Sequence, residues 1–256
     1  MSDEKNVVYH GDVLEKLRNI PDASIGMIYT DPPFNTGDIQ RSARTGNSYV
    51  DARDDYISWV DSWMKECHRV LKSTGTIYVH LDERCAYKVR ADVMDSVFGC
   101  DCYLSTVIWA YDFGGRGKRT WPKKHDTILV YTKTKDGHLF NWDDIDRIPY
   151  MAPGLQKDPE RAAKGKVPTD VWWMSIVGTQ SKERVGYPNQ KPQALVERAI
   201  RASSNPGDII LDPFAGSGTT GGAAIATGRQ FTLIDSNSQS IEIMKKRFES
   251  TKVSWL

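Results

Sequence analysis

The chain has 256 residues, with 34 Lys+Arg against 33 Asp+Glu and a formal net charge of +1. This balance weakens the simplest argument for a nucleic-acid partner, because nucleic-acid-binding domains are usually strongly basic. The composition, 39% hydrophobic and 26% charged, argues against a disordered chain. No apolar run is long enough for a membrane span, and the first residues lack the pattern of a signal peptide, so we expect a cytoplasmic protein.

The four cysteines and five histidines show no spacing typical of a metal site. Cys100 and Cys102 form C-x-C, but no second Cys or His pair lies at zinc-site spacing, and H-E-x-x-H is absent. We therefore expect no bound metal ion and cysteines that are small buried or idle thiols.

Short β-rich runs alternate with helical stretches, which predicts an α/β fold with a largely parallel sheet. Residues 31–53 show little periodicity and indicate a long loop, which is usually functional or mobile. In the first half we expect strands at 6–10, 24–30, 76–81, 103–110 and 126–132, and helices at 12–19, 56–71 and 83–98.

The alternation stops in residues 133–186, where four prolines and scattered charges predict an irregular inserted region. Two tryptophans in it, Trp172 and Trp173, fit a buried core better than a DNA wedge. Order returns with an expected helix at 192–203, a strand at 209–211, a helix from about 217, a strand at 230–234 and a helix at 241–249.

A glycine-rich turn follows the strand at 209–211. Gly216-x-Gly218-x-x-Gly221 matches G-x-G-x-x-G, and Asp235 lies 19 residues after Gly216. Alone, this pattern allows NAD, FAD, another nucleoside cofactor or a tight turn without a ligand. Asp212 favours S-adenosylmethionine, because a carboxylate there would repel a pyrophosphate but suits a cofactor with ammonium and sulfonium cations. Asp235 would then accept from the ribose hydroxyls.

A second motif, Asp31-Pro32-Pro33-Phe34, directly follows the apolar strand at 24–30. The prolines stiffen the backbone and remove two N–H donors. Asp31 and a neighbouring carbonyl could therefore accept both hydrogens of an exocyclic NH2, while Phe34 offers a flat face to a base. Taken alone, the motif is equally consistent with a strand-ending turn that has an Asp cap.

Together and in this order, the two motifs resemble those of the β-class amino-group DNA methyltransferases, a permuted family in which D-P-P-[YF] precedes F-x-G-x-G. The resemblance covers nearly the whole chain, including segments 75–79, 124–131 and 187–192. It implies a Rossmann-like, doubly wound and mostly parallel sheet, S-adenosylmethionine as cofactor, and double-stranded DNA as substrate. The target nucleotide would be flipped out of the duplex.

The resemblance also implies roles for individual residues. Asp31, Pro32, Pro33 and Phe34 would be catalytic. The cofactor-binding residues would be Asp12, Lys191, Pro192, Asp212, Phe214, Gly216, Gly218, Thr219 and Asp235. The chain departs from the family at Tyr187, where His is common, and at Asp235, where Glu is common and reaches further.

The same resemblance divides the chain into a catalytic half at 1–132, a small target-recognition insertion at 133–186 and a cofactor-binding half at 187–256. Charge is uneven along it: residues 111–135 carry a net +5, residues 156–198 a net +3 and the remainder −7. The basic segment 111–135 suits contacts with DNA phosphates. The alternative is a surface loop that is only solvated. The expected DNA-binding residues are Arg116, Lys118, Arg119, Lys123 and Lys124.

The predicted reaction is methyl transfer to N6 of adenine, because the family's cytosine-N4 enzymes more often begin the motif with Ser. Cytosine N4 stays open as the alternative. An RNA or protein amine methyltransferase is disfavoured by the motif order, and a non-catalytic DNA-binding regulator stays open too. Methylation at ring carbon 5 needs a cysteine, typically after a proline, and no cysteine here follows Pro. A prokaryotic or phage origin, a homodimer and a partner restriction endonuclease are compatible with the resemblance.

Overall fold

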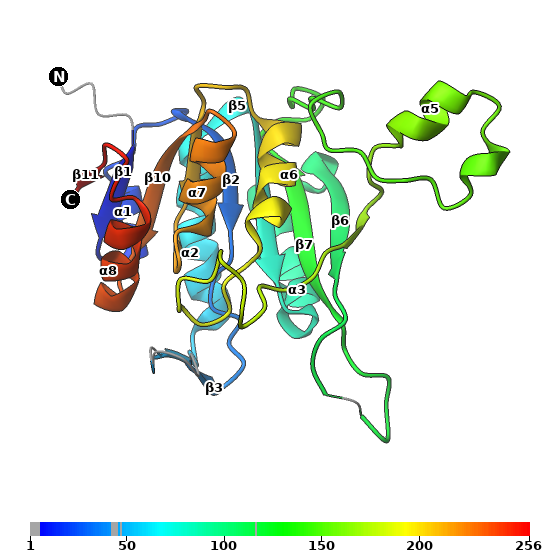
Figure 1. The fold of residues 1–256 in the computed structure, drawn as a ribbon. Coiled ribbons are helices and arrows are strands. Elements are labelled where there is room, and N and C mark those ends of the chain that lie inside the picture. Colours follow the sequence, from blue (N-terminus) through cyan, green and yellow to red (C-terminus); the bar gives the residue numbers. More distant parts are fainter. Residues whose placement is uncertain (1–5, 42–45, 47, 116) are drawn as a thin grey trace.

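The computed structural model describes residues 6–41, 46, 48–115 and 117–256. Within that part of the chain, nine strands form one sheet in the order β11-β1-β10-β9-β2-β5-β7-β6-β8 (Figure 1). Neighbouring strands are parallel except for β7, which is antiparallel to β5 and β6. The strands are β1 (Val7–His10), β2 (Ile25–Thr30), β5 (Leu71–Leu81), β6 (Tyr103–Ala110), β7 (His125–Thr132), β8 (Val171–Trp173), β9 (Ile209–Asp212), β10 (Gln230–Asp235) and β11 (Ser254–Trp255).

Helices cover both faces of this sheet, and each face has its own apolar core. One face packs α1 (Val13–Leu17), α2 (Tyr56–Val70), α3 (Glu83–Val89), a π-helical segment (Arg90–Met94) and α4 (Asp95–Val97). The other packs α6 (Gln193–Ser203), α7 (Thr219–Ala226) and α8 (Ser238–Arg247). The predicted doubly wound α/β fold is confirmed.

Helix α2 shows why the sequence folds this way. Its apolar residues recur every three or four positions, so one stripe is buried while the opposite side stays polar. Trp63 and Met64 in this stripe are fully buried. No helix among the described residues has both the length and the apolarity needed to cross a bilayer.

Four neighbouring parallel strands end with an acidic residue at the same edge of the sheet. In spatial order, β1 leads to Asp12, β10 ends at Asp235, β9 ends at Asp212 and β2 leads to Asp31. Register pairs such as Ile28 with Leu211 bring the ends of β2 and β9 side by side although they are distant in sequence. This carboxyl edge is where ligands bind in open α/β sheets.

Residues 31–53 are not a plain loop, because they contain an antiparallel ribbon of β3 (Asp38–Arg41) and β4 (Ser48–Asp51). This part of the loop prediction is wrong. The two strands bond to each other and do not join the main sheet, so no apolar alternation marks them in the sequence.

The inserted region also contributes to the main sheet. β8, at residues 171–173, pairs with β6 at the sheet edge, so the irregular prediction is wrong for these residues. Trp172 is buried as expected, whereas Trp173 is 74% exposed and contradicts the core assignment, because an edge strand turns alternate side chains outward.

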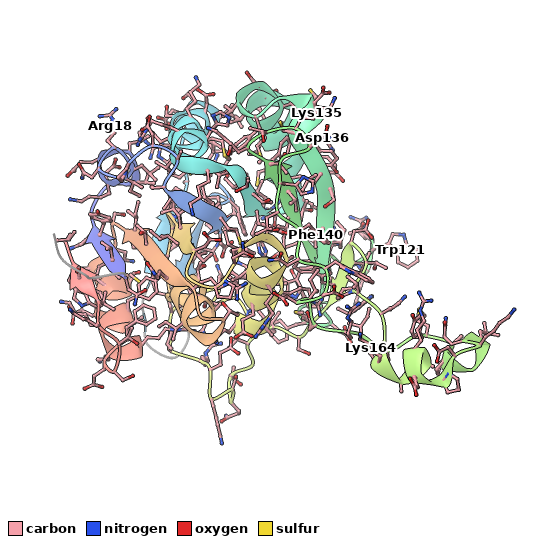
Figure 2. All side chains as sticks on the ribbon, turned by 90° about the horizontal axis from the view of Figure 1, so that it is seen from above. Arg18, Trp121, Lys135, Asp136, Phe140 and Lys164 are labelled. Carbon is pink, nitrogen blue, oxygen red and sulfur yellow. The ribbon has the colours of Figure 1, made fainter. Side chains whose placement is uncertain are left out.

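The direction of β7 decides where the insertion lies. Because β7 is antiparallel to β5, the chain leaves it at the edge opposite the end of β2. From there residues 149–166, with the helix α5 (Pro159–Lys164), extend away from the sheet, and no residue of α5 is buried (Figure 1). The β6–β7 loop, residues 111–124, instead follows β6 at the carboxyl edge of β2. Trp121 in this loop is 94% exposed and points away from the body of the molecule (Figure 2).

Candidate active site

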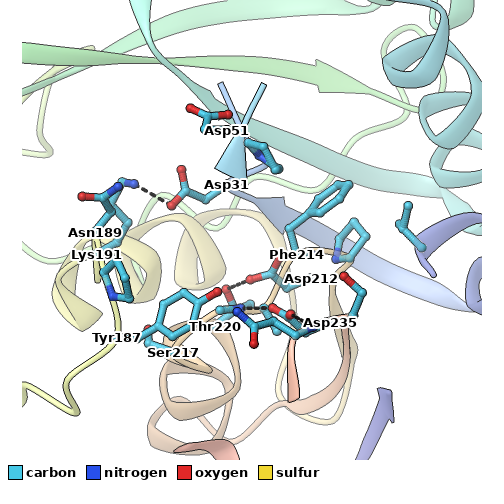
Figure 3. Close-up of a pocket in the computed structure, with 18 of the residues that line it drawn as sticks. Asp31, Asp51, Tyr187, Asn189, Lys191, Asp212, Phe214, Ser217, Thr220 and Asp235 are labelled. Atoms are coloured by element: carbon cyan, nitrogen blue, oxygen red, sulfur yellow. Dashed lines mark hydrogen bonds and ion pairs between the residues drawn. The ribbon is translucent and has the colours of Figure 1, made fainter. Parts of the chain in front are cut away.

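The catalytic motif begins where β2 ends, and its carboxylate faces a lysine from a distant segment. Lys191 Nζ lies 2.5 Å from Asp31 Oδ2 (Figure 3). The other oxygen, Asp31 Oδ1, is buried and has no hydrogen-bond partner within the described chain. The geometry therefore keeps one acceptor of Asp31 unused.

Side chains outside the motif hold the Asp31–Asn35 loop in shape. The Tyr56 hydroxyl donates to the carbonyl of Pro33 at 2.9 Å. Asp51, at the end of the β3–β4 ribbon, accepts from the backbone N–H of Asn35 at 2.7 Å and of Thr36 at 3.1 Å. Asn35 has a left-handed backbone with φ of 58°, which Asn tolerates better than most residues. The chain is thus fixed at Pro33 and just after the proline pair.

Phe34 has an imidazole and an ammonium group as neighbours. Its ring is stacked on His80, with centroids 6.3 Å apart and an interplanar angle of 16°. Lys191 Nζ lies 5.4 Å from the same ring's centroid. Phe34 therefore has a nearly parallel flat ring beside it, which holds it in place.

His80 belongs to a buried polar network that the sequence analysis missed. Its Nδ1 is 3.1 Å from the Tyr29 hydroxyl and its Nε2 is 3.0 Å from Asp126 Oδ2, while the Tyr111 hydroxyl donates to Asp126 Oδ1 at 3.1 Å. If Tyr29 donates to Nδ1, then Nε2–H donates to Asp126, and every group is satisfied. Burial acts to raise the pKa of Asp126, but its interaction with His80 holds it well below the usual range.

The glycine-rich turn between β9 and α7 is built around Asp212. Asp212 Oδ1 accepts from the N–H of Phe214 at 3.0 Å, and Oδ2 accepts from the Thr220 hydroxyl at 2.6 Å. Burial raises the pKa of Asp212 to about 7, with Asp31 and Asp235 adding to the rise. A carboxylate held dry in this way will favour a cationic ligand.

Two glycines are required by the backbone here. Gly216 and Gly218 have φ of 49° and 73°, in the left-handed region. A Cβ on Gly218 would lie 2.9 Å from Met244, and one on Gly216 would lie 3.0 Å from the Tyr187 ring. Gly218 therefore allows α8 to approach closely, whereas Gly216 allows the segment with Tyr187 to close over the turn.

Asp235 shapes the turn from the neighbouring strand. Its Oδ2 accepts from the N–H of Gly216 at 2.7 Å and its Oδ1 from the N–H of Asn237 at 2.8 Å. Burial raises the pKa of Asp235. Each carboxylate oxygen retains a second lone pair, so the ribose contact is compatible with this geometry and stays a prediction.

One cavity of about 320 Å³ joins the two motifs. From the sequence-predicted residues, the structure brings Asp12, Asp31, Pro33, Lys191, Asp212, Phe214, Gly216, Thr219 and Asp235 to its wall. Figure 3 shows Asp31 and Lys191 on one side and Asp212, Thr220 and Asp235 on the other. Four other predicted site residues do not line this cavity, namely Pro32, Phe34, Pro192 and Gly218. Phe34 lines a neighbouring hollow, and Pro192 is the N-cap of α6.

The charge of this wall fits S-adenosylmethionine. Four carboxylates that end or follow neighbouring strands would attract its ammonium and sulfonium cations, whereas a phosphate would be repelled. Asp12 caps α1 through Oδ1, which accepts from the N–H groups of Leu14 and Glu15, and so stands beside the cavity.

The predicted DNA-binding residues divide into two kinds. Lys118 and Arg119 are exposed. Lys123 Nζ is 2.5 Å from Asp82 Oδ2, and Lys124 donates to the carbonyl of Gly114 at 2.7 Å, so both are engaged within the protein. Arg116 lies outside the described residues.

Comparisons with known proteins agree with this geometry. Residues 25–246 match the N6_N4_Mtase family, described as DNA methylase. The DNA adenine methyltransferase YhdJ of Escherichia coli (strain K12) is 34% identical over 265 residues, covering 96% of this chain and 83% of the relative. Two solved structures are similar in fold at low sequence identity. The cytosine-N4-specific PvuII DNA methyltransferase has a TM-score of 0.72 at 21% identity, covering 95% of this chain and 86% of that one. A complex of M1.HpyAVI with S-adenosylmethionine has a TM-score of 0.65 at 22% identity, covering 94% and 98%.

The family match extends over most of the chain and includes both motifs. The motif order and the acidic cavity at the carboxyl edge point the same way. This chain therefore belongs to the family of S-adenosylmethionine-dependent DNA methylases that act on N6 of adenine or N4 of cytosine.

Proposed function

We propose that this chain transfers a methyl group from S-adenosylmethionine to N6 of an adenine flipped out of double-stranded DNA. The observation that carries the proposal is Asp31, which lines the cavity shared with the Asp212 turn and keeps the buried Oδ1 unpaired within the described chain. An NH2 group that donates to Oδ1 removes the cost of this unpaired acceptor.

The residues supply orientation and charge. An exocyclic amine is a poor nucleophile because its lone pair is conjugated with the ring. Hydrogen bonds from NH2 to Asp31 and to the carbonyl of Pro32 favour a pyramidal nitrogen and fix the direction of its lone pair. Phe34, supported by His80, offers a platform on which the flipped base stacks.

S-adenosylmethionine supplies an activated methyl group on a sulfonium cation. Asp212, Phe214, Gly216, Thr219 and Asp235 would hold it, because they form the acidic turn on the opposite wall of the cavity. During transfer the positive charge moves from the sulfur toward the amine nitrogen. The fixed carboxylates of Asp212 and Asp235 face this charge without having to reorient.

The motif beginning with Asp31 and the adenine specificity named for the Escherichia coli relative support adenine over cytosine. Cytosine N4 is the alternative, since the chemistry at the amine is nearly the same. The likeness to the PvuII enzyme concerns the fold and does not decide between the bases.

Methylation-aware sequencing tests the proposal directly. DNA from a methylation-free host that expresses the chain should carry N6-methyladenine at one short sequence, and DNA from cells with Asp31→Ala should carry none. Purified Asp31→Ala should still bind S-adenosylmethionine in calorimetry. N4-methylcytosine without N6-methyladenine would overturn the base assignment, and unmodified DNA with wild-type protein would overturn the activity.

The β6–β7 loop supports a DNA-binding face, because it lies at the carboxyl edge and carries the exposed Lys118 and Arg119. Reading of the target sequence by region 133–186, a homodimer and a partner restriction endonuclease remain predictions. The placement of residues 149–166 at the opposite edge makes the part of the insertion after β8 the better candidate for contact with the flipped base.

A further inference from the structure

Lys191 makes two contacts that the target base itself needs. Its ammonium group is 2.5 Å from Asp31 Oδ2 and 5.4 Å from the Phe34 ring centroid. The amine of a flipped base must donate to Asp31 while its ring stacks on Phe34. A protonated lysine at this position therefore imitates the amine of the substrate.

The ion pair is also shielded from water. The Lys191 side chain is 9% exposed and that of Asp31 24%. Separating two largely buried charges leaves each without its partner, which is strongly unfavourable unless a replacement is supplied for both. The target amine replaces Lys191 at Asp31, but the ammonium group of Lys191 then requires an anion.

The backbone of Lys191 lies near a place where an anion would bind. The Thr219 hydroxyl donates to the Lys191 carbonyl at 3.4 Å, and Thr219 is the first residue of α7. Both residues line the shared cavity. The acidic wall disfavours a doubly charged pyrophosphate, but the single carboxylate of S-adenosylmethionine has two favourable partners at this cavity, the start of α7 and the ammonium group of Lys191.

We propose that Lys191 is a placeholder for the target amine, and that the cofactor's carboxylate draws it from Asp31 so that the base can enter. This inference rests on the proposed function. The exchange makes cofactor and DNA binding cooperative. The target amine replaces Lys191 at Asp31, and the cofactor's carboxylate replaces Asp31 at Lys191, so each ligand completes what the other needs. By thermodynamic linkage, each ligand then strengthens the binding of the other by the same factor.

The test measures DNA affinity by fluorescence anisotropy, using a duplex with the sequence found by methylation-aware sequencing. In wild type, saturating S-adenosylhomocysteine should tighten DNA binding by about 5- to 150-fold, the usual range of such coupling. The analogue 5′-methylthioadenosine, which lacks the amino-acid end, should leave the affinity unchanged.

Lys191→Met should bind DNA without any cofactor about as tightly as wild type does with S-adenosylhomocysteine. This is a gain, whereas the loss of a positive charge or damage to the fold would weaken binding. Asp31→Asn releases the same lysine from the other side and should also abolish the coupling. The matched control is Lys72→Met, which removes a lysine paired with Asp208 at the opposite edge and should keep the wild-type coupling.

The placeholder role of Lys191 would be wrong if Lys191→Met kept the wild-type coupling between S-adenosylhomocysteine and DNA. It would also be wrong if this variant bound DNA no more tightly than wild type in the absence of cofactor. Both readouts are independent of turnover. If the wild-type protein methylates DNA but the DNA affinities of the variants do not change as stated, only the role proposed for Lys191 is wrong. If it methylates no DNA, the proposed function is wrong.

Discussion

Asp51 accepts a hydrogen bond from the backbone N–H of Asn35 at 2.7 Å, and this contact links the β3–β4 ribbon to the catalytic loop. Asp51 is 1% exposed and also accepts from the N–H and hydroxyl groups of Thr36. A carboxylate that takes three donors from two adjacent residues fixes the chain just after Phe34. The ribbon is thus part of the active-site architecture.

Asp51→Ala should therefore lower kcat by about 100-fold, the scale expected when a reacting group is displaced by about 1 Å. The free energy of unfolding should fall by about 1–3 kcal/mol, because buried donors lose their acceptor. Steady-state methylation and urea denaturation measure the two effects. Asp54→Ala, an exposed neighbour, is the control, and an equal loss of kcat in that variant would contradict the role of Asp51.

Cofactor binding should depend on the ionisation of Asp212, because burial raises its pKa to about 7. A cationic cofactor binds the ionised form, so affinity should increase about fivefold to tenfold between about pH 6 and pH 7.5. Calorimetric titration with S-adenosylmethionine measures this increase. Asp212→Asn should bind weakly with a flat pH profile, and a similar slope in that variant would exclude Asp212 as its source.

The raised pKa of Asp212 lowers the stability of the fold at high pH, where the ionised carboxylate increases cofactor affinity. A carboxylic acid whose folded pKa is raised costs no stability below the unfolded value of 3.8 and costs most above about pH 7. Asp212→Asn should accordingly raise the melting temperature more at pH 8 than at pH 5. Melting curves at both pH values, without cofactor, test the sign.

His80→Leu should lower the free energy of unfolding by about 3–5 kcal/mol at neutral pH, because Asp126 then stays buried without its main partner. The interaction with His80 keeps the pKa of Asp126 low against the effect of burial. The native pair therefore stabilises the fold above the unfolded pKa of 3.8, and the difference between wild type and variant should shrink as pH falls below about 4. Urea denaturation of both proteins at neutral pH and near pH 3 measures this difference in the free energy of unfolding. A difference that does not depend on pH would indicate a packing defect alone.

Lys118→Ala and Arg119→Ala should each weaken DNA binding and reduce the slope of log K against log salt by about 0.9, the contribution of one phosphate contact. Lys123→Ala should leave the slope unchanged, since this lysine is paired with Asp82. Anisotropy titrations over a range of salt concentrations give all three slopes. A loss of slope in Lys123→Ala equal to the other two would contradict the division into exposed and engaged lysines.

The elements that carry chemistry were predictable because their signals are local. The apolar run before Asp31 marks β2, and the glycine spacing after Asp212 marks the turn into α7. Parallel strands present their carboxyl ends at one edge, so the meeting of Asp31 and Asp212 follows from the fold class. The site's general form was therefore within reach of the sequence.

The contacts that position those residues were not predictable. Lys191 reaches Asp31 across 160 residues, and His80 reaches Asp126 across 46, so their pairing depends on strand order and register. A signal did exist for His80 and Asp126, since both are polar residues in apolar strands. A single sequence does not show that they face each other. β8 has three residues, too few for a periodic pattern.

The path of residues 149–166 separates this part of the insertion from the edge of the sheet where Asp31 lies. Because α5 buries no residue and leaves the sheet at the edge opposite Asp31, its sequence can change without disturbing the strands that align the amine and the cofactor. Chimaeras that exchange residues 149–166 between relatives should therefore still transfer methyl groups. Their target sequence then shows whether this segment, at the edge opposite Asp31, contributes to target preference.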